Sequence, residues 1–201
     1  MSIIRKVRAV ERLFGRLDAE ISNFQSCTGL HCISGCGKCC SKPDIEATPL
    51  EFLPLAYHWF INRQATAMLE QLENNTFPFC MLYAPLSSSL SDKGSCSSYP
   101  HRGLICRLFG YGASRDKIGA LKLVTCRQIK EQQADNYEKA ISLISQGEYI
   151  PIFSDYYKKL MQIDFKLANQ FMTVNEAIRV ALETVLSYYA YRSFPRQKKA
   201  A

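Results

Sequence analysis

The chain has 201 residues, of which 47% are hydrophobic and 21% charged, and it carries a formal net charge of +7 at pH 7. This composition excludes an intrinsically disordered chain and is typical of one globular domain spanning residues 1–201. The sequence has no signal-peptide core and no apolar run of about eighteen residues, so we expect a cytoplasmic protein without a membrane span. In a reducing compartment, nine cysteines indicate metal or redox sites rather than disulfides.

Residues 2–25 are predicted to form an amphipathic helix. Its apolar residues recur at steps of three and four: Ile3, Val7, Val10, Phe14, Leu17, Ile21 and Phe24. Another face carries a basic stripe of Arg5, Arg8, Arg12 and Arg16. A stripe of this kind is more often a solvated helix face than a site for an anionic partner or a membrane surface.

Four thiols follow within nine residues, at Cys32, Cys36, Cys39 and Cys40. Glycines on both sides of the second thiol allow the backbone to turn several sulfurs inward. Zinc and iron–sulfur clusters both take several cysteine sulfurs as ligands, so the loop is predicted to bind metal. Side chains of successive residues in an extended chain point to opposite sides, so Cys39 and Cys40 are not expected to reach the same ion. One of them would serve a second metal or cluster iron, bridge two metals, or stay a free thiol.

The next predicted elements are a helix over residues 49–72 and a β-hairpin. Thr48-Pro-Leu-Glu51 is a capping box with proline at the first helical position. Residues 76–103 have little periodicity, and the serine-rich segment 87–98 is predicted to be a loop. The strands of the hairpin are predicted at 104–111 and 118–125, which would place Cys106 and Cys126 at one end of a two-stranded ribbon.

The last third is predicted to be helical, over residues 128–146, 151–171 and 174–192, with Thr173 as the N-cap of the last helix. Residues 193–201 form a basic tail that we expect to be disordered. The predicted fold is mainly α: a helical domain with a central cysteine-rich metal-binding loop region and a small β-hairpin. Within it, residues 30–127 are the cysteine-cluster core and 128–192 the C-terminal helical segment.

Four further cysteines complete a set of eight, which is enough for two tetrahedral sites or for one cluster with extra ligands: Cys80, Cys96, Cys106 and Cys126. The ninth, Cys27, is predicted to be a packing residue or a spare thiol. His31 and His101 are alternative ligands, although sulfur alone suffices. Arg102 and Arg107 flank these thiols, and fixed cations beside a thiolate centre lower thiol pKa values and offset its negative charge.

The order and spacing of these cysteines resemble the zinc- or iron-chelating cysteine-cluster family of YkgJ-like proteins. The match consists of Cys-x3-Cys-x2-Cys-Cys at 32–40, Cys80 between aromatic and apolar neighbours, Cys96-x2-Tyr-x2-Arg-x3-Cys106-Arg, and a lone Cys126. It covers residues 30–127 and departs from the family at Gly103, where a proline is usual. The resemblance implies eight metal-linked cysteines and members described as iron–sulfur oxidoreductases.

Two functional hypotheses follow. In the first, the eight cysteines bind an iron–sulfur cluster or zinc, and with iron the protein is an oxidoreductase or electron-transfer protein that needs a redox partner. In the second, zinc is purely structural and the chain is a non-catalytic interaction module. No catalytic triad, phosphate loop or paired-carboxylate helix supports a metal-independent enzyme. Part of the positive net charge balances the negative charge of the thiolates, so it is weak evidence for nucleic-acid binding, which we do not expect.

Overall fold

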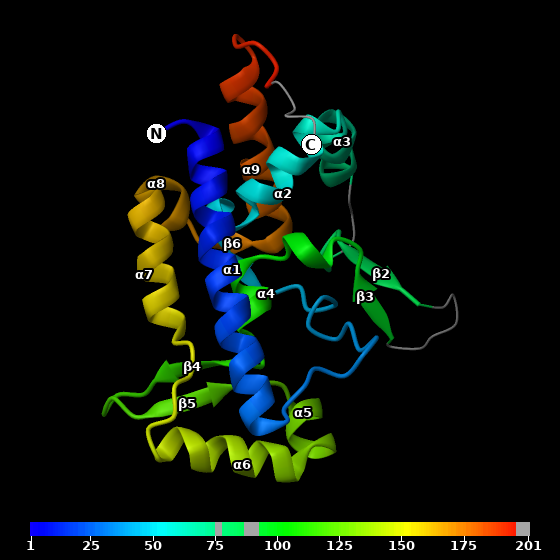
Figure 1. Ribbon diagram of the computed structural model, residues 1–201. Helices are drawn as coiled ribbons and strands as arrows, with labels where there is room; N and C mark the ends of the chain where they lie inside the picture. The colour runs from blue at the N-terminus through cyan, green and yellow to red at the C-terminus, as the bar shows by residue number, and fades with distance from the viewer. Residues whose placement is uncertain (75–77, 87–92, 196–201) are drawn as a thin grey trace, which may run out of the picture.

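The structure is a computed structural model that describes residues 1–74, 78–86 and 93–195 (Figure 1). Its helices in chain order are α1 (Ile3–Thr28), α2 (Pro49–Ile61), α3 (Ala65–Glu73), the 3-10 turn η1 (Tyr99–His101), α4 (Leu104–Leu108), α5 (Arg127–Gln132), α6 (Ala134–Ser145), α7 (Phe153–Ile163), α8 (Phe165–Ala168) and α9 (Val174–Tyr189). Short antiparallel strands pair two by two: β1 (Glu46–Ala47) with β6 (Met172–Thr173), β2 (Tyr83–Pro85) with β3 (Gly94–Cys96), and β4 (Gly112–Arg115) with β5 (Leu121–Val124). The predicted mainly α fold is confirmed.

Helix α1 runs along the molecule and contacts α2, α4, α6 and α7 (Figure 1). All seven apolar residues predicted for its inner face are buried, and the arginine stripe is exposed. The hydroxyl of Ser2 accepts a hydrogen bond from the backbone N–H of Arg5 at the N-terminus, and Gly29 ends the helix with a φ of 76°. A left-handed residue at this position is a common helix stop, and it directs the chain into the cysteine loop.

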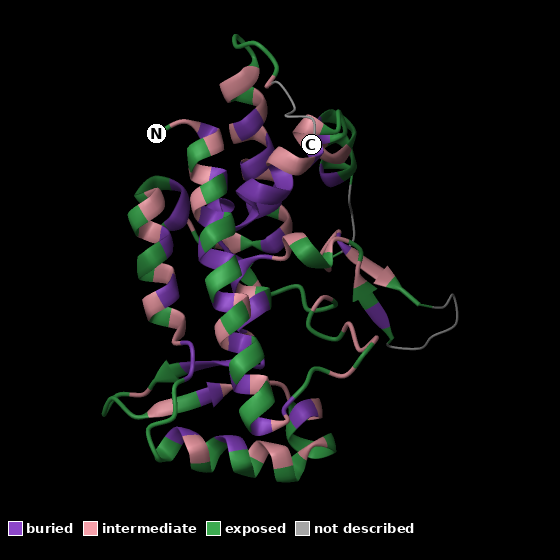
Figure 2. Cartoon of the chain, viewed as in Figure 1, coloured by how far each residue is buried: buried purple, intermediate pink, exposed green. Residues whose placement is uncertain are grey.

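Helices α2 and α9 pack closely against each other and contain much of the buried surface, whereas the cysteine loop is mostly exposed or half-buried (Figure 2). The predicted capping box of α2 is present, with Thr48 paired to Glu51, and the predicted N-cap Thr173 forms a second box with Glu176 in α9. No described helix has the length and apolar character needed to cross a bilayer.

The predicted helix over 49–72 is in fact two helices. The chain leaves α2 at Asn62, and Arg63 adopts a φ of 61°, which no continuous right-handed helix allows. Helix α3 then starts at Ala65. Similar breaks divide two of the other predicted helices, 128–146 at Gln133 between α5 and α6, and 151–171 at Asp164 between α7 and α8. The breaks are so short that the apolar periodicity of the sequence continues across them, and it therefore does not reveal them.

The predicted hairpin exists, but its first strand was placed wrongly. Residues 104–108 form helix α4, and the strand that pairs with β5 begins only at Gly112. Cys106 therefore lies on a helix, while Cys126 follows the hairpin as the N-cap residue of α5. The β2–β3 pair and the β1–β6 pair were not predicted, because their strands are only two or three residues long.

The predicted loop 87–98 and the predicted tail 193–201 are only partly within the described residues. Residues 94–96 form strand β3, and 87–92 lie outside the described part. In the tail, Phe194 packs on Phe60 with ring centroids 5.1 Å apart, and the guanidinium carbon of Arg63 lies 5.6 Å from the centre of its ring. The prediction of disorder for 196–201 falls outside the described residues.

Candidate metal centre

The cysteine loop is fixed at its start and in its middle by distant parts of the chain. The backbone N–H of Cys32 donates to the hydroxyl of Tyr111, at 2.5 Å. Gly35 and Gly37 have φ values of 67° and 59°, which agrees with the prediction that the glycines on both sides of Cys36 allow the backbone to turn. A Cβ on Gly37 would lie 2.8 Å from the backbone of Gly94, so the loop and strand β3 approach each other more closely than any side chain would allow.

Backbone hydrogen bonds bring the second group of cysteines to this loop. The N–H of Cys80 donates to the carbonyl of Cys40 at 3.1 Å, and the N–H of Gly94 donates to the carbonyl of Gly35 at 2.9 Å. Cys96 is then placed by the β2–β3 pair, in which it lies opposite Tyr83. The two segments that carry Cys80 and Cys96 are therefore attached directly to the loop that carries the first four thiols.

Helix α9 holds the Cys80 segment from the other side. The side-chain oxygen of Asn175 accepts the N–H of Met81 at 2.8 Å, and its side-chain nitrogen donates to the carbonyl of Phe79 at 2.9 Å. A cavity of about 280 Å³ lies between this segment and the first turn of α9 and is bordered by Cys80 itself. No pattern in the sequence indicates Asn175, which is 95 positions away from Cys80 along the chain.

A fully buried carboxylate positions Cys106. One oxygen of Glu51 accepts the backbone N–H and the hydroxyl of Thr48, at 2.8 and 3.1 Å. The other oxygen accepts the N–H of Ile105 at 3.0 Å, and the hydroxyl of Tyr157 also hydrogen-bonds Glu51. Glu51 thus caps α2 and also supplies the acceptor for a free N–H in the first turn of α4. Its role in the capping box is visible in the sequence, but its bond to Ile105 is not.

The thiols influence one another electrostatically, and Cys39 is central to this network. Burial raises the pKa of Cys32, Cys80, Cys96 and Cys106, to about 11 for Cys80, and the charge of Cys39 raises each of them further. Cys36 and Cys126 act in the same direction on Cys32. Eight thiols from separate segments therefore share one electrostatic environment.

The two adjacent thiols do not point to opposite sides as expected. Their side chains are close enough to interact, which lowers the pKa of Cys39 and raises that of Cys40. The reason is that the chain is turned here rather than extended, since the N–H groups of Cys40 and Ser41 both donate to the carbonyl of Gly37. Both sulfurs consequently lie on the same side of the loop.

The remaining candidate residues lie in other surroundings. Cys27 is exposed on α1 and borders a separate small cavity with Glu148 and Tyr149. The side chain of His31 contacts Gln25, and the ring of His101 packs on the ring of His58 with centroids 4.4 Å apart. In the described part of the chain, no three Cys, His, Asp or Glu side chains are already arranged to hold a metal ion.

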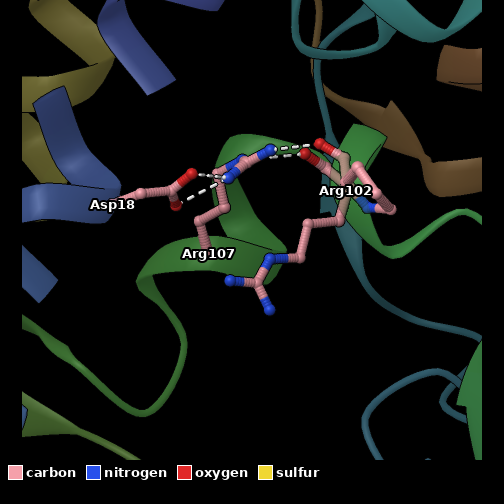
Figure 3. A network of polar contacts seen from close by, with 4 residues as sticks. Asp18, Arg102 and Arg107 are labelled. Carbon is pink, nitrogen blue, oxygen red and sulfur yellow. Dashed lines mark hydrogen bonds and ion pairs between the residues drawn. The ribbon is translucent and has the colours of Figure 1, made fainter. Parts of the chain in front are cut away.

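The two arginines that flank the thiols have different roles in the structure. The guanidinium of Arg107 is buried, forms an ion pair with Asp18, and donates to the carbonyls of Pro100 at 2.6 Å and Arg102 at 3.1 Å (Figure 3). The guanidinium of Arg102 takes no part in the network drawn there and lies over the ring of Tyr99, 3.9 Å from its centre. Arg107 therefore joins α4 to α1, while Arg102 remains near the thiols.

A family model matches the part of the chain that carries these cysteines. The family model CxxCxxCC, described as "Putative zinc- or iron-chelating domain", matches residues 31–138, which is more than half of the chain and includes all eight cysteines of the predicted set. No curated protein and no solved structure gives a match. A donor set made of cysteine sulfurs suits both metals in the family description. The chain belongs to the CxxCxxCC family of zinc- or iron-chelating domains.

Proposed function

We propose that the chain binds zinc or iron through eight cysteine thiolates in one metal-binding core formed by residues 30–127: Cys32, Cys36, Cys39, Cys40, Cys80, Cys96, Cys106 and Cys126. The observation that supports this most directly is that backbone hydrogen bonds attach the segments carrying Cys80 and Cys96 to the loop that carries the first four thiols. Like charges placed together in this way are costly unless a cation neutralises them, and a bound metal supplies that cation.

The leading candidate role is redox: an iron–sulfur oxidoreductase or electron-transfer protein with a partner protein as donor or acceptor. The feature in its favour is that Cys32 and Cys39 are exposed on the loop, so the centre would lie near the surface. An iron–sulfur cluster would supply one-electron chemistry there, and this chain would supply the thiolates, the neighbouring cations and the surface that a partner approaches. The proposed compartment is the reducing cytoplasm, where cysteines serve as metal ligands rather than in disulfides.

The second candidate is an interaction module in which zinc has a structural role only. Here the supporting feature is how little the cysteine-bearing segments contribute to the core: between residues 31 and 46 no residue is buried. A segment without a core of its own often depends on metal for its folding free energy. In this case the exposed arginine stripe of α1 and the described residues 190–195 after α9 are surfaces that a partner could contact.

The deciding experiment measures metal content and the absorption spectrum of the full chain purified without oxygen. Iron with acid-labile sulfide and a broad visible absorption would support the redox role, and colourless zinc would support the structural one. Protein that contains neither metal after supplementation with both would contradict the proposal.

Serine variants then test the ligand set. We expect Cys106→Ser to lose most of the bound metal and Cys27→Ser, the matched control outside the set, to keep it. Equal metal content in the two variants would show that Cys106 is not a ligand. Because metal binding and folding are linked, the metal content of each variant is read together with its circular dichroism spectrum.

A further inference from the structure

We propose that Arg102 is a positioning residue of the metal centre, whose guanidinium supplies the counter-charge and an N–H donor to the thiolate sulfurs that lie around it. This inference rests on the proposed function, since it concerns the same eight thiols. From the sequence, Arg102 and Arg107 are equal candidates for the cation beside the thiols, and the inference assigns this role to Arg102 alone.

The first observation is an unpaired buried donor. The Nε of Arg102 is buried and has no hydrogen-bond acceptor among the described residues. Buried polar groups in proteins are nearly always paired, so an unpaired one usually indicates an interaction that the bare chain does not contain. A thiolate that forms when metal binds is an acceptor of the required charge.

The second observation is what surrounds this guanidinium. Arg102 ends the 3-10 turn η1, between Cys96 at the end of strand β3 and Cys106 on helix α4. Its positive charge also acts on the thiols of Cys32, Cys39 and Cys96, which come from both halves of the cysteine set. Arg107 is five residues further along the chain, but its donors are taken by Asp18 and two backbone carbonyls. Arg102 is consequently the arginine of the pair whose charge is available to the thiols.

The third observation is how Arg102 is held. Its guanidinium lies 3.9 Å from the centre of the Tyr99 ring, and its own carbonyl accepts a hydrogen bond from Arg107. The aromatic ring limits the motion of a flat cation, and the carbonyl bond fixes the backbone from which it extends. A cation restrained in this way near several thiolates opposes their mutual repulsion and orients the sulfurs through hydrogen bonds.

The test is the zinc affinity of the full chain, measured by competition with a chelator of known affinity. Arg102→Gln removes the charge and the Nε donor but keeps the backbone carbonyl that Arg107 uses. We expect this variant to bind Zn²⁺ roughly 10- to 100-fold more weakly, the range typical of groups that orient metal ligands. Arg102→Lys restores the charge without the planar fork and should recover part of the lost affinity. The control, Arg115→Gln, removes an exposed arginine from strand β4 and should bind as the original chain does.

The outcomes separate this inference from the function on which it rests. If the original chain and the Arg115 variant fail to bind Zn²⁺ and iron, the proposed metal centre is wrong. If they bind and Arg102→Gln binds equally well, the role of Arg102 is wrong. If Arg102→Gln and Arg102→Lys weaken Zn²⁺ binding equally, the proposed counter-charge role is also wrong. Restoring the positive charge would then recover no affinity, as expected when the loss is purely structural. Thermal unfolding of the metal-free variants shows whether each of them is folded. If Arg102→Gln does not fold, the Zn²⁺ affinity of Arg102→Lys is compared with that of the original chain instead.

Discussion

The buried carboxylate of Glu51 connects the helical core to the metal centre, and its replacement by glutamine tests that connection. The side chain is fully buried and receives hydrogen bonds at both oxygens, from the backbone N–H groups of Thr48 and Ile105 and from two hydroxyls. In Glu51→Gln one oxygen becomes an NH₂ group, which is itself a donor. Whichever way the amide is turned, one buried backbone N–H faces a donor and loses its acceptor.

The magnitude follows from that single lost bond. A buried donor left without an acceptor costs about 1–3 kcal/mol. Removing a buried carboxyl group also removes a desolvation cost, because burial raises the pKa of Glu51, so the lower half of that range is the better expectation. We therefore predict that Glu51→Gln lowers the free energy of unfolding by about 1–2 kcal/mol.

The assay is urea unfolding at equal metal loading, with Glu73→Gln as the matched control. Glu73 is exposed at the end of α3, and its variant should stay within about 0.5 kcal/mol of the original chain. Hydrogen exchange at the Ile105 amide gives a local measurement and should become faster in the Glu51 variant alone. A Glu51→Gln chain as stable as the Glu73 control, with unchanged exchange at Ile105, would refute the reasoning.

Two further predictions concern the packing of Gly103 and the titration of Asp164. The φ of Gly103 is −65°, which proline allows, but a Cβ there would lie 2.8 Å from the Phe52 ring. Gly103→Pro should cost about 1–3 kcal/mol in urea unfolding. The control Gly15→Ala, in the interior of α1 with open space around its Cβ, should instead raise stability by about 0.5–1 kcal/mol. Burial raises the pKa of Asp164, but the Lys6 hydrogen bond and a backbone N–H outweigh it and lower the pKa below 3.8. The stability this carboxylate provides is complete above that value and is lost as pH falls through its folded pKa. The stability difference from Asp164→Asn should therefore shrink below about pH 4 in a pH series of thermal unfolding; a constant difference would contradict it.

The sequence by itself determined the features that depend on neighbouring residues. The apolar periodicity of residues 2–25 predicted the buried face of α1, and two capping boxes marked the starts of α2 and α9. The glycines beside Cys36 predicted a turned loop, and the spacing of its thiols pointed to the family. Each of these patterns depends on residues three or four positions apart, so it can be recognised without knowing how the rest of the molecule folds.

Only the tertiary structure decided which distant groups meet. Residues 104–108 have the composition of a strand but form a helix, since the carboxylate of Glu51, 54 positions earlier, accepts an N–H in its first turn. The same applies to Arg107, whose partner Asp18 lies 89 positions away and leaves Arg102 as the cation near the thiols. Such contacts depend on how the helices pack across the core, and local sequence patterns do not predict that packing.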